Sequence, residues 1–233
     1  MIGKFKVLGI IPARGGSKGI PKKNIATVNG RPLISWTIDA AKGSKYLDRT
    51  IVSSDCEEIQ IAAKQSGGEV PFTRPDKLAT DTSAGIDPII HALNMIPGYD
   101  IVVVLQPTSP LRMTEDIDNA LEVLVDSGQA SCVSVTRAPV HPNLIYFGGD
   151  DGKLKRCLSS EPVSRRQDED IAYYLNGAVY ASFASQVLDT HKLIDQDTVA
   201  YIMPESRSLD IDVMTDLEQF KSIVLKDYAR EIR

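Results

Sequence analysis

The chain has 233 residues, of which 42% are hydrophobic and 24% are charged, and its formal net charge is −5 at pH 7. This length suits one α/β domain with an insertion, and the hydrophobic fraction is enough to build a core without disulfide staples. The acidic balance predicts no nucleic-acid partner, because general nucleic-acid binding needs a large basic surface. We also expect no membrane span, since no run of about 18 apolar residues occurs.

The cysteines Cys56, Cys132 and Cys157 stand far apart and form no CxxC pair. Their spacing predicts neither a disulfide framework nor a zinc site, and it fits a reducing cytoplasm. Lys4 and Lys6 precede only a short apolar run, so we expect no secretory signal and a cytoplasmic protein.

Apolar β-rich runs alternate with helical patterns along the first part of the chain. The expected strands are 6–11, 49–53, 101–105 and 132–136, and the expected helices are 33–42, 57–66, 84–94 and 115–125. Continuous apolar strands such as IVVVL indicate burial on both faces. The alternation therefore predicts a doubly wound α/β fold, with a largely parallel sheet between helices.

This alternation stops after Arg137, where residues 138–175 are rich in proline, glycine and charge. We expect an insertion with short hairpins there, outside the core. Strand patterns return at 178–181 and 199–203, and a last helix is expected over 215–227. The prediction is one domain over residues 1–233.

The last helix carries two local signals. Thr215 and Glu218 have the spacing of a capping box, which would start the helix. Leu217, Phe220 and Val224 form one apolar stripe, which predicts that this face packs on the core.

The segment after the first strand, IIPARGGSKGIPKKN at 10–24, combines three glycines with four cations and contains no acid. Glycines let backbone N–H groups approach an anion closely, and Lys or Arg side chains suit a polyphosphate. The alternative is a solvated basic loop. The segment matches neither the Walker A pattern, since Ile20 follows Gly19, nor GxGxxG. It therefore predicts a phosphate-binding loop of another kind.

Two further polar segments follow predicted strands, where ligands of open α/β sheets bind. QPTSPLR at 106–112 follows the strand 101–105, and we interpret Gln106 as a site residue; the other polar side chains are either site residues or parts of a rigid loop. In SLDID, Asp210 and Asp212 share one face if the backbone is extended. Two such carboxylates suit Mg²⁺ together with substrate phosphates. The alternative is that Asp212 only caps the last helix.

Three segments have weaker signals. Arg165 and Arg166 of SRRQD suit a substrate carboxylate, although a charge run is often a solvated face. Asn176-Gly177 of NGAVY has the composition of a hairpin turn, and Tyr180 is either a site or a core residue. Arg74 and Ser83 flank a loop, and they are either near a nucleotide base or, for Ser83, a helix cap.

These segments together resemble the acylneuraminate cytidylyltransferases, or CMP-sialic acid synthetases. IIPARGGSKGIPKKN, LQPTSPLR, SRRQD, NGAVY and SLDID occur in the family's order over nearly the whole chain. The resemblance implies a Rossmann-like nucleotidyltransferase fold with a mixed, mainly parallel sheet. It also implies that the segment of about 138–175 forms a homodimer and completes the partner's sugar site.

The resemblance implies a role for each matching residue. The nucleotide CTP would be held by Ala13, Arg14, Gly15, Ser17, Lys23, Asn24, Arg74 and Ser83. An acidic nine-carbon sugar would be held by Gln106, Arg165, Arg166 and Tyr180, and Mg²⁺ or Mn²⁺ by Asp210 and Asp212. Arg14, Lys23 and Asp212 would be catalytic, the last as a possible proton acceptor.

The implied reaction is transfer of CMP from CTP to the anomeric hydroxyl of N-acetylneuraminic acid, with release of pyrophosphate. Legionaminic or pseudaminic acid is an open alternative. GSKGIPKKN favours the neuraminate branch over the related octulosonate cytidylyltransferases. An alternative of another class is a non-catalytic module that binds sugar nucleotides, because fold does not determine function. The intact set of Arg14, Lys23, Asp210 and Asp212 favours the enzyme.

Overall fold

The computed structural model describes residues 1–158 and 170–231, and its main sheet has six strands in the order β10-β6-β9-β5-β1-β4. The strands are β1 (Val7–Pro12), β4 (Arg49–Ser53), β5 (Ile101–Val104), β6 (Ser131–Arg137), β9 (Tyr173–Phe183) and β10 (Val199–Ile202). β1 pairs in parallel with β4 and β5, as β6 does with β10, whereas β9 runs antiparallel to β5 and β6. The predicted mixed, mainly parallel α/β sheet is confirmed.

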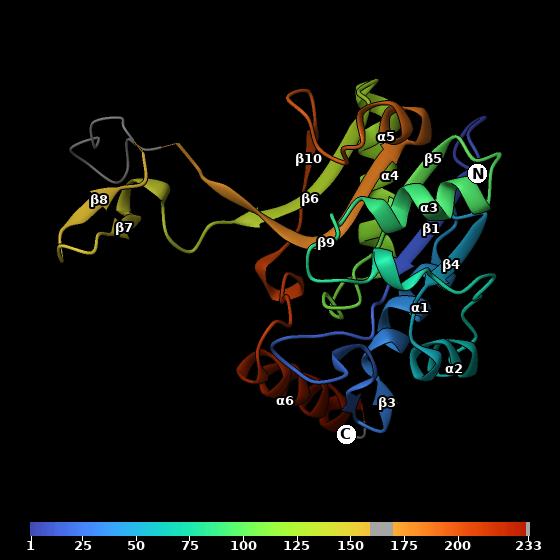
Figure 1. Ribbon diagram of the computed structural model, residues 1–233, viewed down its shortest axis with the longest axis horizontal. Coiled ribbons are helices and arrows are strands. Elements are labelled where there is room, and N and C mark those ends of the chain that lie inside the picture. Colours follow the sequence, from blue (N-terminus) through green and yellow to red (C-terminus); the bar gives the residue numbers. More distant parts are fainter. Residues whose placement is uncertain (159–169, 232–233) are drawn as a thin grey trace.

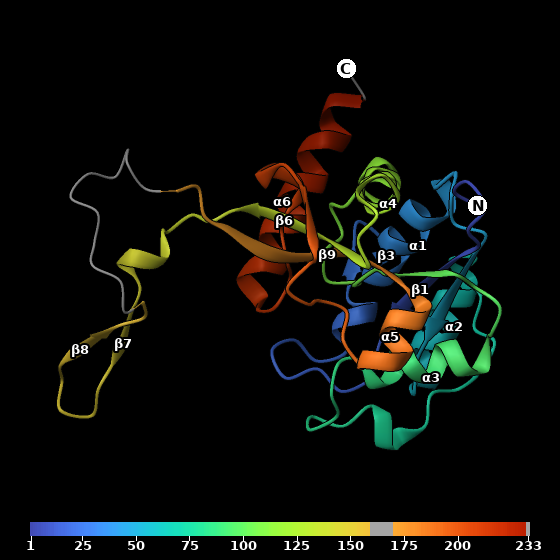
Figure 2. The same ribbon diagram turned by 90° about the horizontal axis from the view of Figure 1, so that it is seen from above.

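Helices cover both faces of this sheet, as Figures 1 and 2 show. One face carries α1 (Leu33–Gly43), α2 (Glu57–Gln65) and α4 (Thr114–Ser127), and the other carries α3 (Asp87–Met95) and α5 (Ala184–Thr190). Alternate residues of a strand point to opposite faces of the sheet. In β5, Ile101 and Val103 pack with α1 and α4, whereas Val102 and Val104 pack with α3 and α5. Burial on both faces explains the continuous apolar strands.

One helix begins later in the chain than the sequence predicts. The helix expected over 84–94 begins at Asp87, with Pro88 in its first turn. Proline is accommodated there because the first N–H groups of a helix have no intrahelical partner. This shift leaves residues 79–86 as a loop beside the glycine-rich segment.

The last helix, α6 (Met214–Glu231), packs its predicted stripe of Leu217, Phe220 and Val224 against Ile20 and Ile211. The predicted cap is wrong. The Asp216 carboxylate accepts hydrogen bonds from the N–H groups of Asp212 (2.8 Å) and Val213 (2.9 Å). An aspartate in the first turn caps these free donors as well as a Thr–Glu pair would.

A narrow arm leaves the sheet between β6 and β9 and carries the hairpin of β7 (Tyr146–Gly148) and β8 (Leu154–Arg156), as Figures 1 and 2 show. The expected short hairpin is thus present. β9 begins at Tyr173, which pairs with Arg137, so the end of the expected insertion belongs to the main sheet.

Smaller elements complete the chain. A two-stranded ribbon joins β2 (Thr27–Val28) to β3 (Arg31–Pro32), and 3-10 turns occur at Lys23–Ile25, Asp76–Leu78, Pro142–Leu144 and Glu205–Arg207. In the ranges that the structure describes, no helix has the length and apolar character needed to cross a bilayer.

Candidate active site

The glycine-rich loop leaves the carboxyl end of β1, and two contacts set its backbone. Asn24 Nδ2 donates to the Arg14 carbonyl oxygen (3.0 Å), and the Gly15 N–H donates to Asp55 Oδ1 (3.0 Å). Packing requires glycine at two positions. A Cβ on Gly15 would lie 2.9 Å from the Cβ of Cys56, and one on Gly19 would lie 2.2 Å from the Asp212 carbonyl oxygen. The loop therefore lies tightly between the turn after β4 and the SLDID segment.

A cavity of about 310 Å³ opens between this loop and the loop after β5. Its lining brings together residues from three segments: Pro12, Arg14, Gly16, Ser17, Lys18, Gly19, Lys23, Asn24, Gln106, Pro107, Thr108 and Asp212. Three of the loop's four cations, a residue of QPTSPLR and one SLDID carboxylate thus share one cavity. This is the arrangement expected at the carboxyl edge of a doubly wound sheet.

The cations of the cavity hold carboxylates of the protein. Arg14 Nη1 and Lys18 Nζ both pair with Asp81, at 2.9 and 3.3 Å. Lys23 Nζ donates to the Ile211 carbonyl oxygen (2.6 Å) and pairs with Asp212 (3.0 Å). The side chain of Lys23 is only 14% exposed, so it is anchored on the SLDID segment. A bound polyphosphate would compete with Asp81 for the loop cations.

Asp210 lies deeper than its neighbour Asp212. Its Oδ1 atom is buried and has no hydrogen-bond partner among the described residues. Burial raises the pKa of Asp210, a hydrogen bond from Thr108 opposes this, and the Asp212 charge raises it further. A buried carboxylate oxygen without a partner is unusual, and a bound cation would satisfy it.

Within the described ranges, no three Asp, Glu, His or Cys side chains cluster as metal ligands. A divalent cation here would therefore depend on the carboxylates of Asp210 and Asp212 together with oxygens from a ligand. That donor set suits Mg²⁺, which usually takes one or two carboxylates plus substrate phosphates.

The predicted sugar residue Gln106 lies near Asp210, whereas Tyr180 packs against the core on the α3 and α5 face of the sheet. The position of a Cβ on Gly177 would be 3.5 Å from Gln106 Oε1, 3.6 Å from Asp210 Oδ2 and 3.4 Å from Ser109 Oγ. Tyr180 is half-buried, and burial followed by the Asp210 charge raises the pKa of its hydroxyl. The bare backbone of Gly177 thus lies at the junction of the two predicted subsites.

The prediction of a hairpin turn at Asn176-Gly177 is wrong, because both residues lie inside β9. The register of β9 against β6 shifts between Val133 and Val135, and Gly177 adopts φ +73°. Asn176 is buried; its Nδ2 donates to Ser208 Oγ (2.9 Å), and its Oδ1 accepts from Ser134 Oγ (2.6 Å). Asn-Gly supplies a bulge here, which needs the same positive φ as a tight turn.

Arg74 and Ser83 do not line the cavity. Arg74 is buried and binds Ser53, with Nε 3.1 Å from its hydroxyl and Nη2 on its carbonyl oxygen. Burial lowers the pKa of Arg74 to about 10, although the Asp55 charge opposes this. Ser83 Oγ donates to the Lys77 carbonyl oxygen (2.8 Å). Arg165 and Arg166 lie outside the described residues.

Arg112 of QPTSPLR points inward. It is buried, and it donates to Thr37 Oγ1 (2.8 Å) and to the Ser109 and Gln106 carbonyl oxygens (3.2 and 3.3 Å). Burial lowers its pKa to about 9. Arg112 therefore orders the loop that presents Gln106, and the rigid-loop interpretation holds for this residue.

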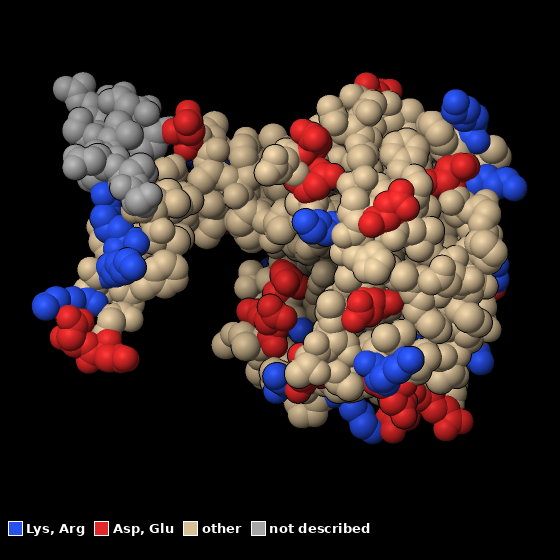
Figure 3. Space-filling model, turned by 45° about the horizontal axis from the view of Figure 1, so that its top comes forward, with Lys and Arg blue, Asp and Glu red and all other residues tan. Residues whose placement is uncertain are grey.

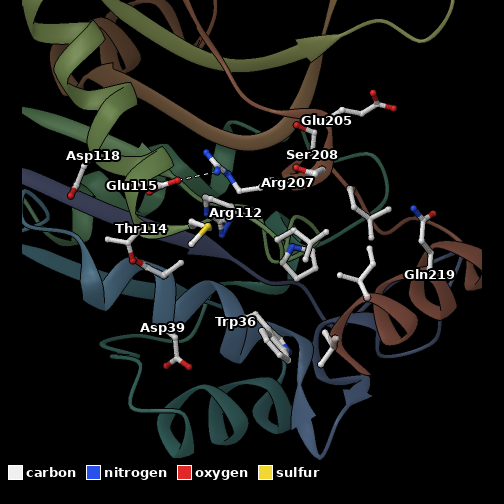
Figure 4. A pocket seen from close by; sticks show the side chains of 18 of the residues that line it. Trp36, Asp39, Arg112, Thr114, Glu115, Asp118, Glu205, Arg207, Ser208 and Gln219 are labelled. Atoms are coloured by element: carbon white, nitrogen blue, oxygen red, sulfur yellow. Dashed lines mark hydrogen bonds and ion pairs between the residues drawn. The ribbon is translucent and has the colours of Figure 1, made fainter. Parts of the chain in front are cut away.

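A larger hollow of about 1390 Å³ opens between α1, α4 and α6, on the other side of the QPTSPLR loop (Figure 4). Its wall includes Trp36 and Arg207, and Arg207 pairs with Glu115 (2.9 Å) and with the buried Asp116 (2.7 Å). Among the described residues, none of those predicted to bind nucleotide, sugar or metal lines this hollow. The smaller cavity is therefore the candidate active site.

Sequence reasoning missed Asp55 and Asp81. Asp55 follows β4 at the same sheet edge as the other site loops, so its position could have indicated it. Asp81 stands in a loop that no local pattern connects to the glycine-rich segment.

The fold and site together define an α/β protein with a cationic, glycine-rich loop beside two carboxylates. More particularly, the chain belongs to the cytidylyltransferase family, whose model matches residues 8–228. It is 33% identical to the N-acylneuraminate cytidylyltransferase of Escherichia coli O18:K1:H7, over 98% of this chain and 54% of that protein. The chain thus spans about half the length of that relative.

Two shorter relatives are matched over nearly their whole lengths. One is the CMP-N,N'-diacetyllegionaminic acid synthase of Legionella pneumophila, 35% identical over 91% of this chain and 93% of that protein. The other is the pseudaminic acid cytidylyltransferase of Campylobacter jejuni, 31% identical over 95% and 97%. The solved structure of CMP:2-keto-3-deoxy-manno-octonic acid synthetase complexed with CTP superposes with a TM-score of 0.72 at 18% identity, covering 95% of this chain and 99% of that one. This last likeness shows the shared fold.

Proposed function

We propose that this chain transfers CMP from CTP to the anomeric hydroxyl of a nonulosonic acid, giving a CMP-sugar and pyrophosphate. One observation carries the proposal: the glycine-rich loop brings Arg14, Lys18 and Lys23 to a cavity that also contains Gln106 and Asp212. Polyphosphate-binding cations and predicted acceptor-binding groups thus meet in one place. The names of the relatives reported above refer to cytidylyl transfer or to a CMP-linked nonulosonic acid, which agrees with this assignment.

The reaction forms a bond between the sugar oxygen and the α-phosphorus and breaks the bond from that phosphorus to the bridging oxygen of pyrophosphate. Charge that develops on the phosphates would be neutralised by Arg14 and Lys23. The attacking oxygen must lie in line with the leaving group, so the protein's main task is to position both substrates. The sugar hydroxyl must also lose its proton, and Asp212 is our proposed acceptor.

The two SLDID carboxylates fit a divalent metal, Mg²⁺ or Mn²⁺. The buried, unpartnered Asp210 Oδ1 and the exposed Asp212 would bind it, and phosphate oxygens would complete its shell. Such an ion, when bound, supplies positive charge to the transferring phosphoryl group. Lys23, which pairs with Asp212, would hold this carboxylate close to the loop.

The acceptor would lie over Gly177, between Gln106 and Tyr180, with Arg165 and Arg166 as the clamp for its carboxylate. N-acetylneuraminic acid is our first candidate, because the segments of the chain resemble the neuraminate branch. The relatives that share similar identity carry legionaminic and pseudaminic acid in their names, so these acids are the two specific alternatives. The choice depends on groups around the sugar's acyl substituents.

We also propose that the chain works as a homodimer through its arm. Large apolar side chains gather on the arm and are exposed, among them Phe147 (59%) and Leu154 (70%). Figure 3 shows the described part of the arm standing clear of the body. A two-fold contact between two arms would bury these side chains. Phe147→Ser combined with Leu154→Ser should then give monomers in sedimentation, whereas a wild-type monomer would contradict the proposal.

The closing test of function is a turnover assay with CTP, Mg²⁺ and a panel of N-acetylneuraminic, legionaminic, pseudaminic and octulosonic acids, reading pyrophosphate and CMP-sugar. We expect turnover with at least one nine-carbon acid and the highest kcat/KM with N-acetylneuraminic acid. Binding of CTP without turnover on any acid would favour the non-catalytic alternative. Sharing of sites between subunits can be tested by mixing an Arg165/Arg166 double alanine variant with Asp210→Asn, which should recover part of the activity.

A further inference from the structure

Asp55 occupies the turn between β4 and α2, where its carboxylate lies against the glycine-rich loop. Oδ1 accepts the hydrogen bond of the Gly15 N–H at 3.0 Å, and Oδ2 is 3.3 Å from the place where a Gly15 Cβ would stand. The side chain is half-buried. It therefore covers one side of the glycine and fixes the direction of its N–H group.

The charge of the same carboxylate also acts on Arg74, which does not line the cavity. Arg74 is buried, and its backbone N–H donates to the Ser54 carbonyl oxygen (2.9 Å). Burial lowers the pKa of Arg74, and the charge of Asp55 opposes this.

A carboxylate beside a polyphosphate site repels the ligand unless it organises the groups that bind it. Asp55 holds the loop between Arg14 and Gly16, which both line the cavity. The backbone at Gly15 has no side chain of its own that could pack and fix it, so a hydrogen bond must set its direction.

We propose that Asp55 is a positioning residue for the nucleotide, which orients the peptide after Arg14. The inference rests on the proposed binding of CTP and deepens it. Among the described residues predicted to bind the acceptor, neither Gln106 nor Tyr180 contacts Asp55, so its effect falls on the triphosphate side of the site. Asp55 acts through Gly15 and does not itself touch the reacting atoms.

Three variants test this role: Asp55→Ala, Asp55→Asn, and Glu57→Gln as the matched control. Glu57 is an exposed acid in the first turn of α2, so its substitution also removes one negative charge next to the loop. Asparagine keeps an acceptor for the Gly15 N–H but loses the negative charge. Calorimetry with CTP and with inorganic tripolyphosphate measures binding, and steady-state kinetics measure the KM of each substrate.

We expect Asp55→Ala to weaken CTP binding by about tenfold or more, because the half-buried Gly15 N–H loses its partner and the loop loses the bond that orients it. Asp55→Asn should give a smaller loss, and Glu57→Gln should match the wild type. The KM for the acidic sugar should stay within about twofold in all three, since surface changes away from a contact have small effects. Melting temperatures show that each variant is folded.

Two results would overturn the proposal. One is a CTP affinity in Asp55→Ala equal to that of the Glu57→Gln control. The other is a proportional loss for CTP and sugar, which would mean a general structural defect. Failure of the proposed function looks different: the wild type would bind CTP or tripolyphosphate and form no CMP-sugar. In that case the binding comparison still decides the role of Asp55.

Discussion

Gly19→Ala tests whether contact between the glycine-rich loop and the SLDID segment sets the active geometry. A Cβ at Gly19 would stand 2.2 Å from the Asp212 carbonyl oxygen, whereas ordinary contact begins at 3.4 Å, so the two segments must separate by about 1.2 Å. The loop cannot simply swing outward, because the next residue, Ile20, is buried against α6. Lys23 also ties the loop to Ile211.

A displacement of about 1 Å between catalytic groups costs on the order of 10²-fold in rate, or about 2.7 kcal/mol of transition-state stabilisation. We therefore expect kcat/KM of Gly19→Ala to fall by that factor in the pyrophosphate assay. Overpacking of this kind costs about 1–3 kcal/mol of stability, so the variant should still fold. Circular dichroism and thermal melting verify this.

Gly85→Ala is the matched control, because a Cβ there meets nothing within 4 Å and the backbone is not left-handed. It makes the same change of residue type without the clash, and its activity should remain within about twofold of the wild type. If Gly19→Ala is as active as Gly85→Ala, the loop and the SLDID segment are not held by this contact and our reasoning about the site is wrong.

Three further predictions concern the charges. Asp210→Asn should lower Mg²⁺-dependent turnover on the order of 10²-fold without lowering the melting temperature, because burial already raises the pKa of this carboxyl group; near-normal turnover at limiting Mg²⁺ contradicts it. Asp81→Asn frees two loop cations and should lower the KM for CTP a few-fold, more at low salt, and an increased KM would refute the competition. The hydrogen bond and charge of Arg49 lower the pKa of Glu69 below its ordinary 4.5. The Arg49–Glu69 pair therefore stabilises the fold fully above pH 4.5. This contribution is lost as the pH falls through the lowered pKa of Glu69. Glu69→Gln should remove under about 1 kcal/mol of this acid-side dependence in urea unfolding measured from about pH 3 to 7; an unchanged profile rejects the assignment.

The sequence predicted the parts of the site that depend on local chemistry. Cations and glycines directly after an apolar strand indicate anion binding wherever the loop goes, because the backbone freedom and the charges are properties of the segment itself. The same holds for the paired carboxylates of SLDID and for the continuous apolar strands, which require cover on both faces. Topology then brings these loops to one edge of the sheet, so Arg14, Lys23, Gln106 and Asp212 line one cavity.

Other features were decided by partners distant along the chain, and no local pattern carries them. Asn176-Gly177 has the composition of a turn, yet it forms a bulge inside β9. There the Asn176 side chain is hydrogen-bonded to Ser134 and Ser208. Arg112 resembles a site cation, but its guanidinium donates to Thr37 and is buried. Asp55 belongs to an ordinary strand-to-helix turn, and the hydrogen bond from the Gly15 N–H connects it with the glycine-rich loop. The physical reason is the same for all three features. Burial and hydrogen bonding depend on which segments the fold brings together, so the residue type alone does not predict the hydrogen-bond partner.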